Sequence, residues 1–121
     1  MRSTLKQKQQ AYLRGQKAED FAALYLRVKG YHILKRRLKT PLGEIDILAQ
    51  KGNTFVAIEV KARDTFAEAA FSLTLTQERR IERALTYYLS GRPDQPSIRF
   101  DVILIAPWRW PQHIVSAWRA R

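Results

Sequence analysis

The spacing of apolar residues predicts a first helix after a polar N-terminal segment. Between Tyr12 and Lys29 apolar positions recur every three or four residues, the period of a helix with one buried face. Gly30 follows, and glycine is typical of the position just after a helix. Residues 1–10 are polar and basic without this period. We interpret them as a basic flexible arm ahead of a single domain over residues 11–121.

A second helix is predicted after a loop. Residues 62–73 have a weak pattern and read as a loop with room for one helical turn, and a loop of this length in a small domain is more often functional than idle. Thr74 and Gln77 then match a capping box. Apolar residues follow Ile81 at three, four, seven and eight positions, so they would share the buried face of the helix.

Five further segments have the composition of β-strands, with β-branched and aromatic residues between turn residues. They cover residues 31–38, 43–48, 55–61, 98–106 and 113–118. The fourth is almost continuously apolar, which favours a place inside the sheet, and the short fifth favours an edge. The order α-β-β-β-α-β-β predicts an α/β domain with a mixed central β-sheet flanked by helices.

Alternation divides the second and third strands between two faces. A tight turn at Gly52-Asn53 would place residue i opposite residue 105 − i, and therefore Asp46 opposite Glu59. Two carboxylates with Cβ atoms about 5 Å apart destabilise a sheet unless a cation, a proton or an ammonium group such as Lys61 neutralises them. The face that carries Asp46, Glu59 and Lys61 is therefore a candidate for a chemically active site. The other is wholly apolar and carries Ile45, Ile47, Ala49, Val56, Ile58 and Val60.

Composition and charge narrow the class of protein. The 121 residues include no cysteine, which excludes disulfides and thiolate metal sites, and no apolar run that would span a membrane. We expect a cytoplasmic protein without a membrane partner. The net charge is +11, and residues 1–39 hold eleven Lys and Arg against Glu19 and Asp20. This basic first third favours nucleic acid as a partner, with solubility or an acidic phospholipid surface as alternatives.

The polar face of the hairpin carries the strongest chemical signal. Asp46 and Glu59 offer oxygen ligands that suit Mg²⁺ or Mn²⁺ rather than zinc, and the Val60 carbonyl would add another. Lys61 lies on the same side as Glu59 and would position a water molecule and stabilise charge on a phosphorane-like transition state. The alternative is a pair of surface carboxylates neutralised by Lys61 or a nearby arginine, with Glu44 and Lys61 as a cross-strand ion pair.

Two helical residues are candidates to join this cluster. Glu19 on the first helix and Gln77 on the second could approach the same face, although Glu19 is equally consistent with surface decoration and Gln77 with a simple cap. His32 and His113 lack metal-ligand spacing and are interpreted as partly buried strand residues. The phosphate-binding surface is predicted to include Lys35, Arg36, Arg37, Lys39 and Arg63.

These residues resemble the motifs of a known group of nucleases. Asp46, followed after thirteen residues by Glu59-Val60-Lys61, resembles the motif of the PD-(D/E)xK nuclease superfamily. Further segments resemble the bacterial YraN-like family of predicted endonucleases, which is similar to archaeal Holliday-junction resolvases. These segments are Gly15-x-x-Ala18-Glu19-x-x-Ala22-x-x-Tyr25-Leu26, Gly30-Tyr31-x-Ile33-Leu34, Gly43-Glu44-Ile45-Asp46-Ile47-Leu48-Ala49 and Phe100-Asp101-Val102.

The resemblance implies a restriction-endonuclease-like fold and a role for each candidate residue. Asp46 and Glu59 would bind the metal, and Lys61 would be the catalytic lysine. Glu19 would be the helix carboxylate that completes the site. Gln77 falls where the superfamily often places a helix Gln or Lys.

We therefore expect a Mg²⁺- or Mn²⁺-dependent DNA endonuclease that hydrolyses phosphodiester bonds by metal-activated water. Branched or otherwise non-duplex DNA is a candidate substrate, and resolvase-like action on a symmetric junction would require a homodimer. Two alternatives belong to other classes. One is a catalytically inactive nucleic-acid-binding module on the same scaffold, and the other is an adaptor that binds a protein partner.

Overall fold

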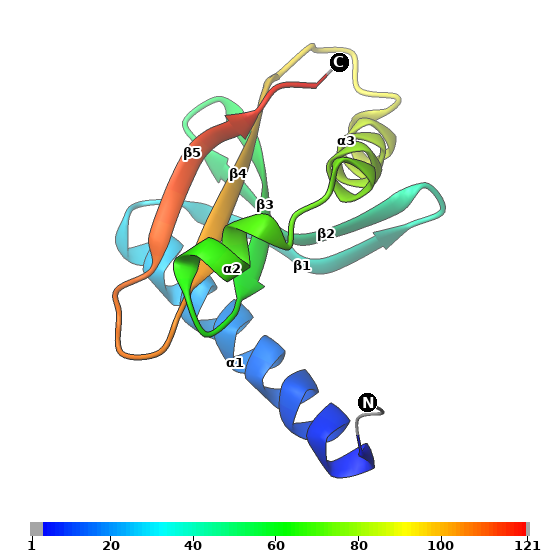
Figure 1. The fold of residues 1–121 in the computed structure, drawn as a ribbon. Coiled ribbons are helices and arrows are strands. Elements are labelled where there is room, and N and C mark those ends of the chain that lie inside the picture. Colours follow the sequence, from blue (N-terminus) through cyan, green and yellow to red (C-terminus); the bar gives the residue numbers. More distant parts are fainter. Residues whose placement is uncertain (1–3, 121) are drawn as a thin grey trace.

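The structure, a computed structural model, describes residues 4–120, and residues 8–14 by their backbone alone. It contains three helices and five strands within this range (Figure 1). In chain order these are α1 (Leu5–Val28), β1 (His32–Thr40), β2 (Gly43–Lys51), β3 (Thr54–Ala62), α2 (Phe66–Phe71), α3 (Leu75–Leu89), β4 (Ser97–Ile105) and β5 (Gln112–Trp118).

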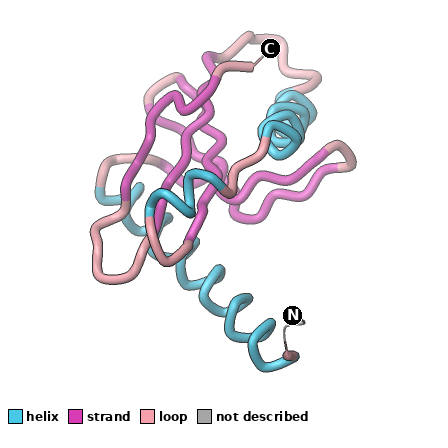
Figure 2. Tube along the Cα trace, viewed as in Figure 1, coloured by secondary structure: helices cyan, strands magenta, loops and turns pink. Residues whose placement is uncertain are grey.

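The five strands form one sheet in the order β1-β2-β3-β4-β5. β3 and β4 are parallel, and the other neighbouring pairs are antiparallel. The chain crosses from β3 to β4 through α2 and α3, and Figure 2 shows helices on both sides of the sheet. The predicted α/β domain with a mixed sheet and flanking helices is confirmed, with β4 inside the sheet and β5 at its edge. The structure has one more element than the predicted order, because α2 lies in the segment interpreted as a loop with room for one helical turn.

The β2–β3 hairpin has the predicted register. Ile47 pairs with Ile58 and Ala49 with Val56, as the turn at Gly52-Asn53 requires. These four side chains pack against Ala22, Ala23 and Leu26 of α1, so the predicted apolar face is buried under the first helix. Ile45 is the exception.

Ile45 packs instead in a second cluster beneath α3. There it joins Leu48 and Ala57, and the predicted apolar face of α3 contributes Ile81, Ala84 and Leu85. The apolar middle of the second face of the hairpin, at Leu48 and Ala57, is therefore also buried. Only its end beyond Leu48 and Ala57, where Asp46 and Glu59 lie, remains available for polar chemistry.

Helix α1 begins at Leu5, earlier than the helical period after Tyr12 predicts, and the interpretation of residues 1–10 as a basic flexible arm stays a prediction. The Thr4 hydroxyl accepts a hydrogen bond from the Gln7 amide, and the Gln7 side chain accepts one from the Thr4 amide. This capping box starts the helix in a polar stretch where no buried face is needed. Residues 1–3 lie outside the described residues.

A buried aspartate in the middle of β4 links this strand to β5. The carboxylate of Asp101 is fully buried and accepts hydrogen bonds from the Arg99 guanidinium at 2.8 and 2.9 Å, from His113 Nε2 at 2.8 Å and from the Ser116 amide at 3.0 Å. Burial alone would raise its pKa, but these hydrogen bonds together lower the pKa to about 2. His113 is the partly buried strand residue that was predicted, whereas His32 is exposed.

Candidate functional site

The candidate site lies where β2 and β3 separate. Their pairing extends only to Ile47 and Ile58, after which β2 continues beside β1 and β3 continues beside β4 (Figure 1). The Val60 amide, just beyond the last pair, donates a hydrogen bond of 2.9 Å to Oδ2 of Asp46. The Asp46 carboxylate thus replaces the missing strand partner and is held in the opening between the strands.

Glu59 faces Asp46 across this opening. Burial is the main reason that the pKa of Glu59 rises from 4.5 to about 9, and a hydrogen bond with Asp46 and the Asp46 charge raise it further. Lys61 acts in the opposite direction but does not offset these effects. The carboxyl of Glu59 therefore holds its proton at neutral pH unless a cation takes the place of that proton.

Two hollows meet at this carboxyl pair, one on each side of the sheet end. The α3-side hollow, of about 370 Å³, contains Asp46, Glu59 and Lys61 together with Gln77 and Arg80 of α3. The α1-side hollow, of about 430 Å³, contains the same three residues together with Glu19, Val60 and Arg63. All five residues predicted to be catalytic thus border one or both of two hollows that share Asp46, Glu59 and Lys61, with Glu19 on the α1 side and Gln77 on the α3 side.

Glu19 is held close to Asp46 by the basic end of β1. Its side chain is 16% exposed, and its Oε1 accepts a hydrogen bond from Arg37 Nε at 3.3 Å. Burial and then the charge of Asp46 raise the pKa of Glu19, while Arg37 and Arg36 lower it. The carboxylate of Glu19 is therefore partly buried and borders the α1-side hollow that also contains Asp46 and Glu59.

The basic residues predicted to bind nucleic acid divide into two groups. Arg36 donates to Asp20 at 2.7 Å, and Arg37 binds Glu19, so both hold carboxylates of α1. Arg37 also has a positive φ of 52°, which turns the backbone of β1 at this point. The remaining three are exposed: Lys35 on β1, Lys39 at the border of a third hollow with Glu19 and Asp46, and Arg63 in the α1-side hollow.

Two alternatives for the polar residues can be compared with the structure. The cap is formed, because Gln77 Oε1 accepts from the Thr74 amide at 3.1 Å and the Gln77 amide donates to Thr74 Oγ1 at 3.2 Å. Gln77 nevertheless also borders the α3-side hollow. The ion pair between Glu44 and Lys61 is not formed, although both side chains border this hollow, and the charge of Lys61 acts instead on Glu59.

Sequence reasoning missed Arg80. Its exposed side chain borders the α3-side hollow and makes no ion pair with any described residue. Gly43 allows β2 to approach the backbone of Arg80 closely, because a Cβ atom at Gly43 would lie 2.2 Å from the Arg80 carbonyl oxygen. The strand that carries Asp46 therefore touches the backbone of α3. Gly43 ahead of Glu44 was a signal for close backbone approach that could have been used.

The donor set fits a hard divalent cation. Asp46 and Glu59 supply carboxylate oxygens and Val60 a backbone carbonyl, which are ligands that Mg²⁺ and Mn²⁺ accept alongside water and phosphate oxygens. Among the described residues no group of three or more His, Cys, Asp or Glu side chains is placed to hold a metal ion. Any cation here would therefore depend on two carboxylates, the carbonyl and non-protein ligands.

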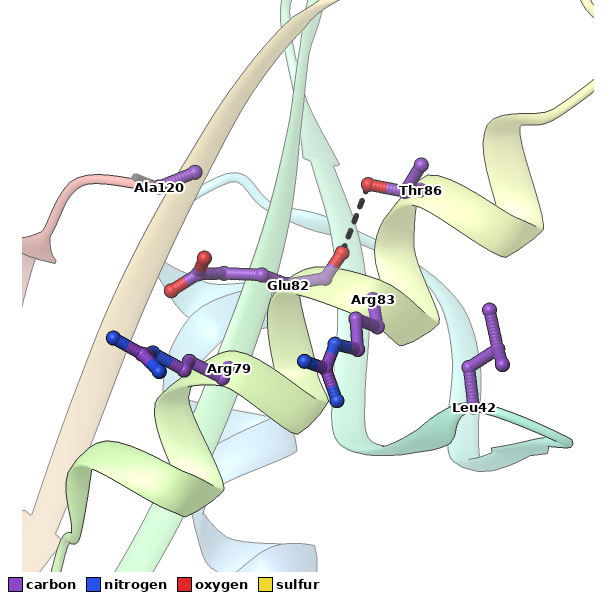
Figure 3. Close-up of a pocket in the computed structure, with 6 residues that line it drawn as sticks. All are labelled: Leu42, Arg79, Glu82, Arg83, Thr86 and Ala120. Carbon is purple, nitrogen blue, oxygen red and sulfur yellow. Dashed lines mark hydrogen bonds between the residues drawn. The ribbon is translucent and has the colours of Figure 1, made fainter.

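A further hollow of about 440 Å³ lies on the outer side of α3 (Figure 3). Its acidic residue, Glu82, accepts a hydrogen bond from Trp118 Nε1 at 3.0 Å, and its backbone carbonyl accepts one from Thr86. Arg79 and Arg83 complete its polar lining. It contains no facing carboxylates, so the candidate chemistry lies at the β2–β3 opening.

Comparison with known proteins gives the family. Residues 18–105 match the Uncharacterised protein family UPF0102. The chain belongs to this family. A UPF0102 protein of Bartonella henselae is 49% identical over 109 residues, covering 88% of this chain and 86% of the relative. A UPF0102 protein of Chelativorans sp. is 45% identical over 116 residues, covering 94% of each chain.

A UPF0102 protein of Paramagnetospirillum magneticum is 48% identical over 117 residues, covering 92% of this chain and 91% of the relative. Membership in UPF0102 confirms the resemblance to the YraN-like family, and the site residues Glu19, Asp46, Glu59, Lys61 and Gln77 all lie within the matched segment. No helix among residues 4–120 of this UPF0102 protein is long and apolar enough to cross a membrane.

Proposed function

We propose that this UPF0102 protein is a Mg²⁺- or Mn²⁺-dependent DNA endonuclease with a restriction-endonuclease-like fold of the PD-(D/E)xK superfamily. The observation that carries the proposal is the carboxyl pair of Asp46 and Glu59 at the opening between β2 and β3, with Lys61 in the same two hollows. The high pKa of Glu59 supports a cation at this place, because a cation would offset both the burial of the carboxylate charge and its repulsion by Asp46.

Each side chain has a task that its position supports. Asp46, Glu59 and the Val60 carbonyl would hold the cation, which when bound would lower the pKa of a water molecule and offset phosphate charge. Lys61 would orient that water molecule and neutralise charge that develops on the scissile phosphate. Glu19, partly buried near Asp46, would accept a hydrogen bond from the water and keep it oriented.

The α3 side of the opening supplies groups for substrate. Gln77 and Arg80 border the hollow that contains the carboxyl pair, and Arg80 has no acidic partner among the described residues. A phosphodiester in this hollow would find a free guanidinium next to the reacting group. Lys35, Lys39 and Arg63 would extend the contact with the backbone, while Arg36 and Arg37 mainly position α1.

The test is cleavage of linear and four-way-junction DNA with Mg²⁺, Mn²⁺ or EDTA. We expect metal-dependent nicking that falls about 100-fold or more in Asp46→Asn and in Lys61→Ala. The variant Glu68→Gln changes an exposed carboxylate on α2 and serves as the control. Cleavage that persists in the Asp46 and Lys61 variants would refute the proposal. Salt-sensitive DNA binding without cleavage under any metal would favour the inactive binding module instead.

A further inference from the structure

The loop between β4 and β5 presents two tryptophans to solvent. Trp108 is 102% and Trp110 is 82% exposed, whereas Trp118 is partly buried and stacks on Phe100 with ring centroids 5.2 Å apart. Tryptophan is a residue that proteins normally bury in large part. Two solvent-exposed tryptophans close together in the chain form an exposed apolar surface, and such surfaces are typical of binding sites.

This loop is held in a defined shape. Trp108 has a φ of 62°, a left-handed conformation that is uncommon for a bulky residue. Pro107 and Pro111 flank the two tryptophans, and Pro111 is buried. The guanidinium of Arg109 lies 5.9 Å from the centre of the Phe66 ring on α2. The two indole rings therefore project from an anchored loop, which reduces the entropy lost when a ligand binds them.

The loop also begins beside the candidate site. Pro107 lines an apolar hollow of about 240 Å³ together with Phe21, Lys17 and Arg63. Arg63 lines both this hollow and the α1-side hollow, where Asp46, Glu59 and Lys61 lie. A chain-like ligand that enters the α1-side hollow could thus continue past Arg63 towards the tryptophans.

The charges around the loop indicate the chemistry of such a ligand. Lys17, Arg63 and Arg109 form no ion pair with any described residue, and the order Trp108-Arg109-Trp110 alternates aromatic and cationic groups. Aromatic side chains interleaved with cations suit a ligand with flat apolar faces and regular negative charges. Single-stranded nucleic acid has both, whereas a duplex hides the faces of its bases.

We propose that Trp108 and Trp110 stack on unpaired bases of single-stranded DNA that leads into the α1-side hollow. The inference rests on the proposed nuclease function for the choice of DNA, and it narrows the substrate class to DNA with an unpaired segment next to the cleaved bond. An acidic membrane surface would also suit tryptophan and arginine, but it would not explain why hollows lead from this loop past Arg63 to Asp46 and Glu59.

Tryptophan fluorescence tests the proposal in the full chain, with EDTA present so that no cleavage occurs. In Trp118→Phe the remaining emission comes from the loop, and in the double variant Trp108→Phe/Trp110→Phe it comes from Trp118. We expect oligothymidylate to quench the loop emission and to leave the Trp118 emission unchanged. Affinity for oligothymidylate should fall about 5- to 100-fold in Trp108→Ala or Trp110→Ala, since loss of a stacked base has an effect of this size.

The control is Tyr87→Ala, which removes an exposed aromatic residue from α3 and should leave affinity within twofold. Binding of blunt duplex DNA should also change less than twofold in the tryptophan variants. Oligothymidylate that binds without quenching the loop emission would overturn the proposal. The proposal would also be overturned if phosphatidylserine vesicles but not DNA quenched the loop emission, or if the quenching came from self-association of the protein. A preference for oligouridylate over oligothymidylate would overturn it as well. Quenching by DNA in a protein that cleaves nothing would instead overturn only the proposed nuclease function.

Discussion

Replacing Glu59 by glutamine tests the electrostatic cost of the candidate site. Glutamine keeps the size of the side chain and resembles the protonated carboxyl group, but it cannot ionise. In the folded protein burial and Asp46 raise the pKa of Glu59 from 4.5 to about 9. In the unfolded chain neither effect operates, so Glu59 ionises there at its ordinary pKa.

The sign and size of the effect follow from this difference. Between pH 4.5 and about 9 the folded state binds more protons than the unfolded state, so the free energy of unfolding falls as pH rises. Each pKa unit corresponds to about 1.36 kcal/mol, which gives a loss of about 3 kcal/mol by pH 7. That loss is a large part of the 5–15 kcal/mol that stabilises an ordinary domain.

Urea unfolding in EDTA at pH 5 and pH 7 measures this loss. We expect the unaltered protein to lose about 2–3 kcal/mol between these pH values, and Glu59→Gln to lose far less and to be the more stable protein at pH 7. Glu44→Gln is the matched control, because Glu44 borders the same hollow but is exposed. Its stability should stay within about 0.5 kcal/mol of the unaltered protein.

Addition of Mg²⁺ provides a second measurement on the same proteins. A cation held by Asp46 and Glu59 would stabilise the unaltered protein by about 2.7 kcal/mol at a concentration of 100 times its Kd, and Glu59→Gln should lose most of this gain. The reasoning would be refuted if Glu59→Gln were less stable than the unaltered protein at pH 7 in EDTA. That result would mean that the ionised carboxylate is well solvated or well paired in the fold.

Further predictions concern Gly43, Arg80 and Asp101. Gly43→Ala should lower the free energy of unfolding by about 1–3 kcal/mol in urea titrations, because the new Cβ would overlap the Arg80 carbonyl oxygen, 2.2 Å away. Arg80→Ala should weaken DNA binding and reduce the slope of log affinity against log salt concentration by about 1, whereas Arg92→Ala should not, because Arg92 pairs with Asp94. Asp101→Asn should destabilise the protein by about 3–5 kcal/mol at pH 7, since it removes the buried carboxylate that accepts hydrogen bonds from Arg99, His113 and Ser116. In the unaltered protein the contribution of Asp101, about 2 kcal/mol from a pKa lowered from 3.8 to about 2, should be present above pH 3.8 and disappear as pH falls through 2, as acid unfolding would measure.

The hairpin could be predicted because its determinants are local. Strict alternation and the turn at Gly52-Asn53 together allow only one register, and any slip would bury charged side chains. Ile45 could not be placed in the same way. Beyond Ile47 the strand leaves its partner, and its packing is then decided by α3. Thr4 and Gln7 form the capping box that starts α1 at Leu5, whereas the apolar period that indicates a buried face begins only at Tyr12.

The candidate site shows a similar division between local and tertiary determinants. Asp46, Glu59 and Lys61 share a face because of strand alternation, so spacing was enough to group them. The pairing of Arg36 with Asp20 and of Arg37 with Glu19 depends on how α1 crosses β1, and a linear pattern contains no such information. Arg36 and Arg37, which are predicted to bind phosphate, therefore also hold carboxylates of α1.

The separation of β2 and β3 explains how the sheet tolerates two facing carboxyl groups. Where the ladder opens, the Val60 amide loses its strand partner, and an unpaired buried amide would itself be destabilising. Oδ2 of Asp46 accepts a hydrogen bond from this amide at 2.9 Å and so replaces the missing partner. This bond holds the carboxylate beside Glu59, where it helps to raise the pKa of Glu59 to about 9. Replacement of Asp46 by serine, which can still accept the Val60 hydrogen bond, should therefore lower the pKa of Glu59 and reduce the pH dependence of unfolding in EDTA. If the dependence stayed unchanged, burial alone would account for it.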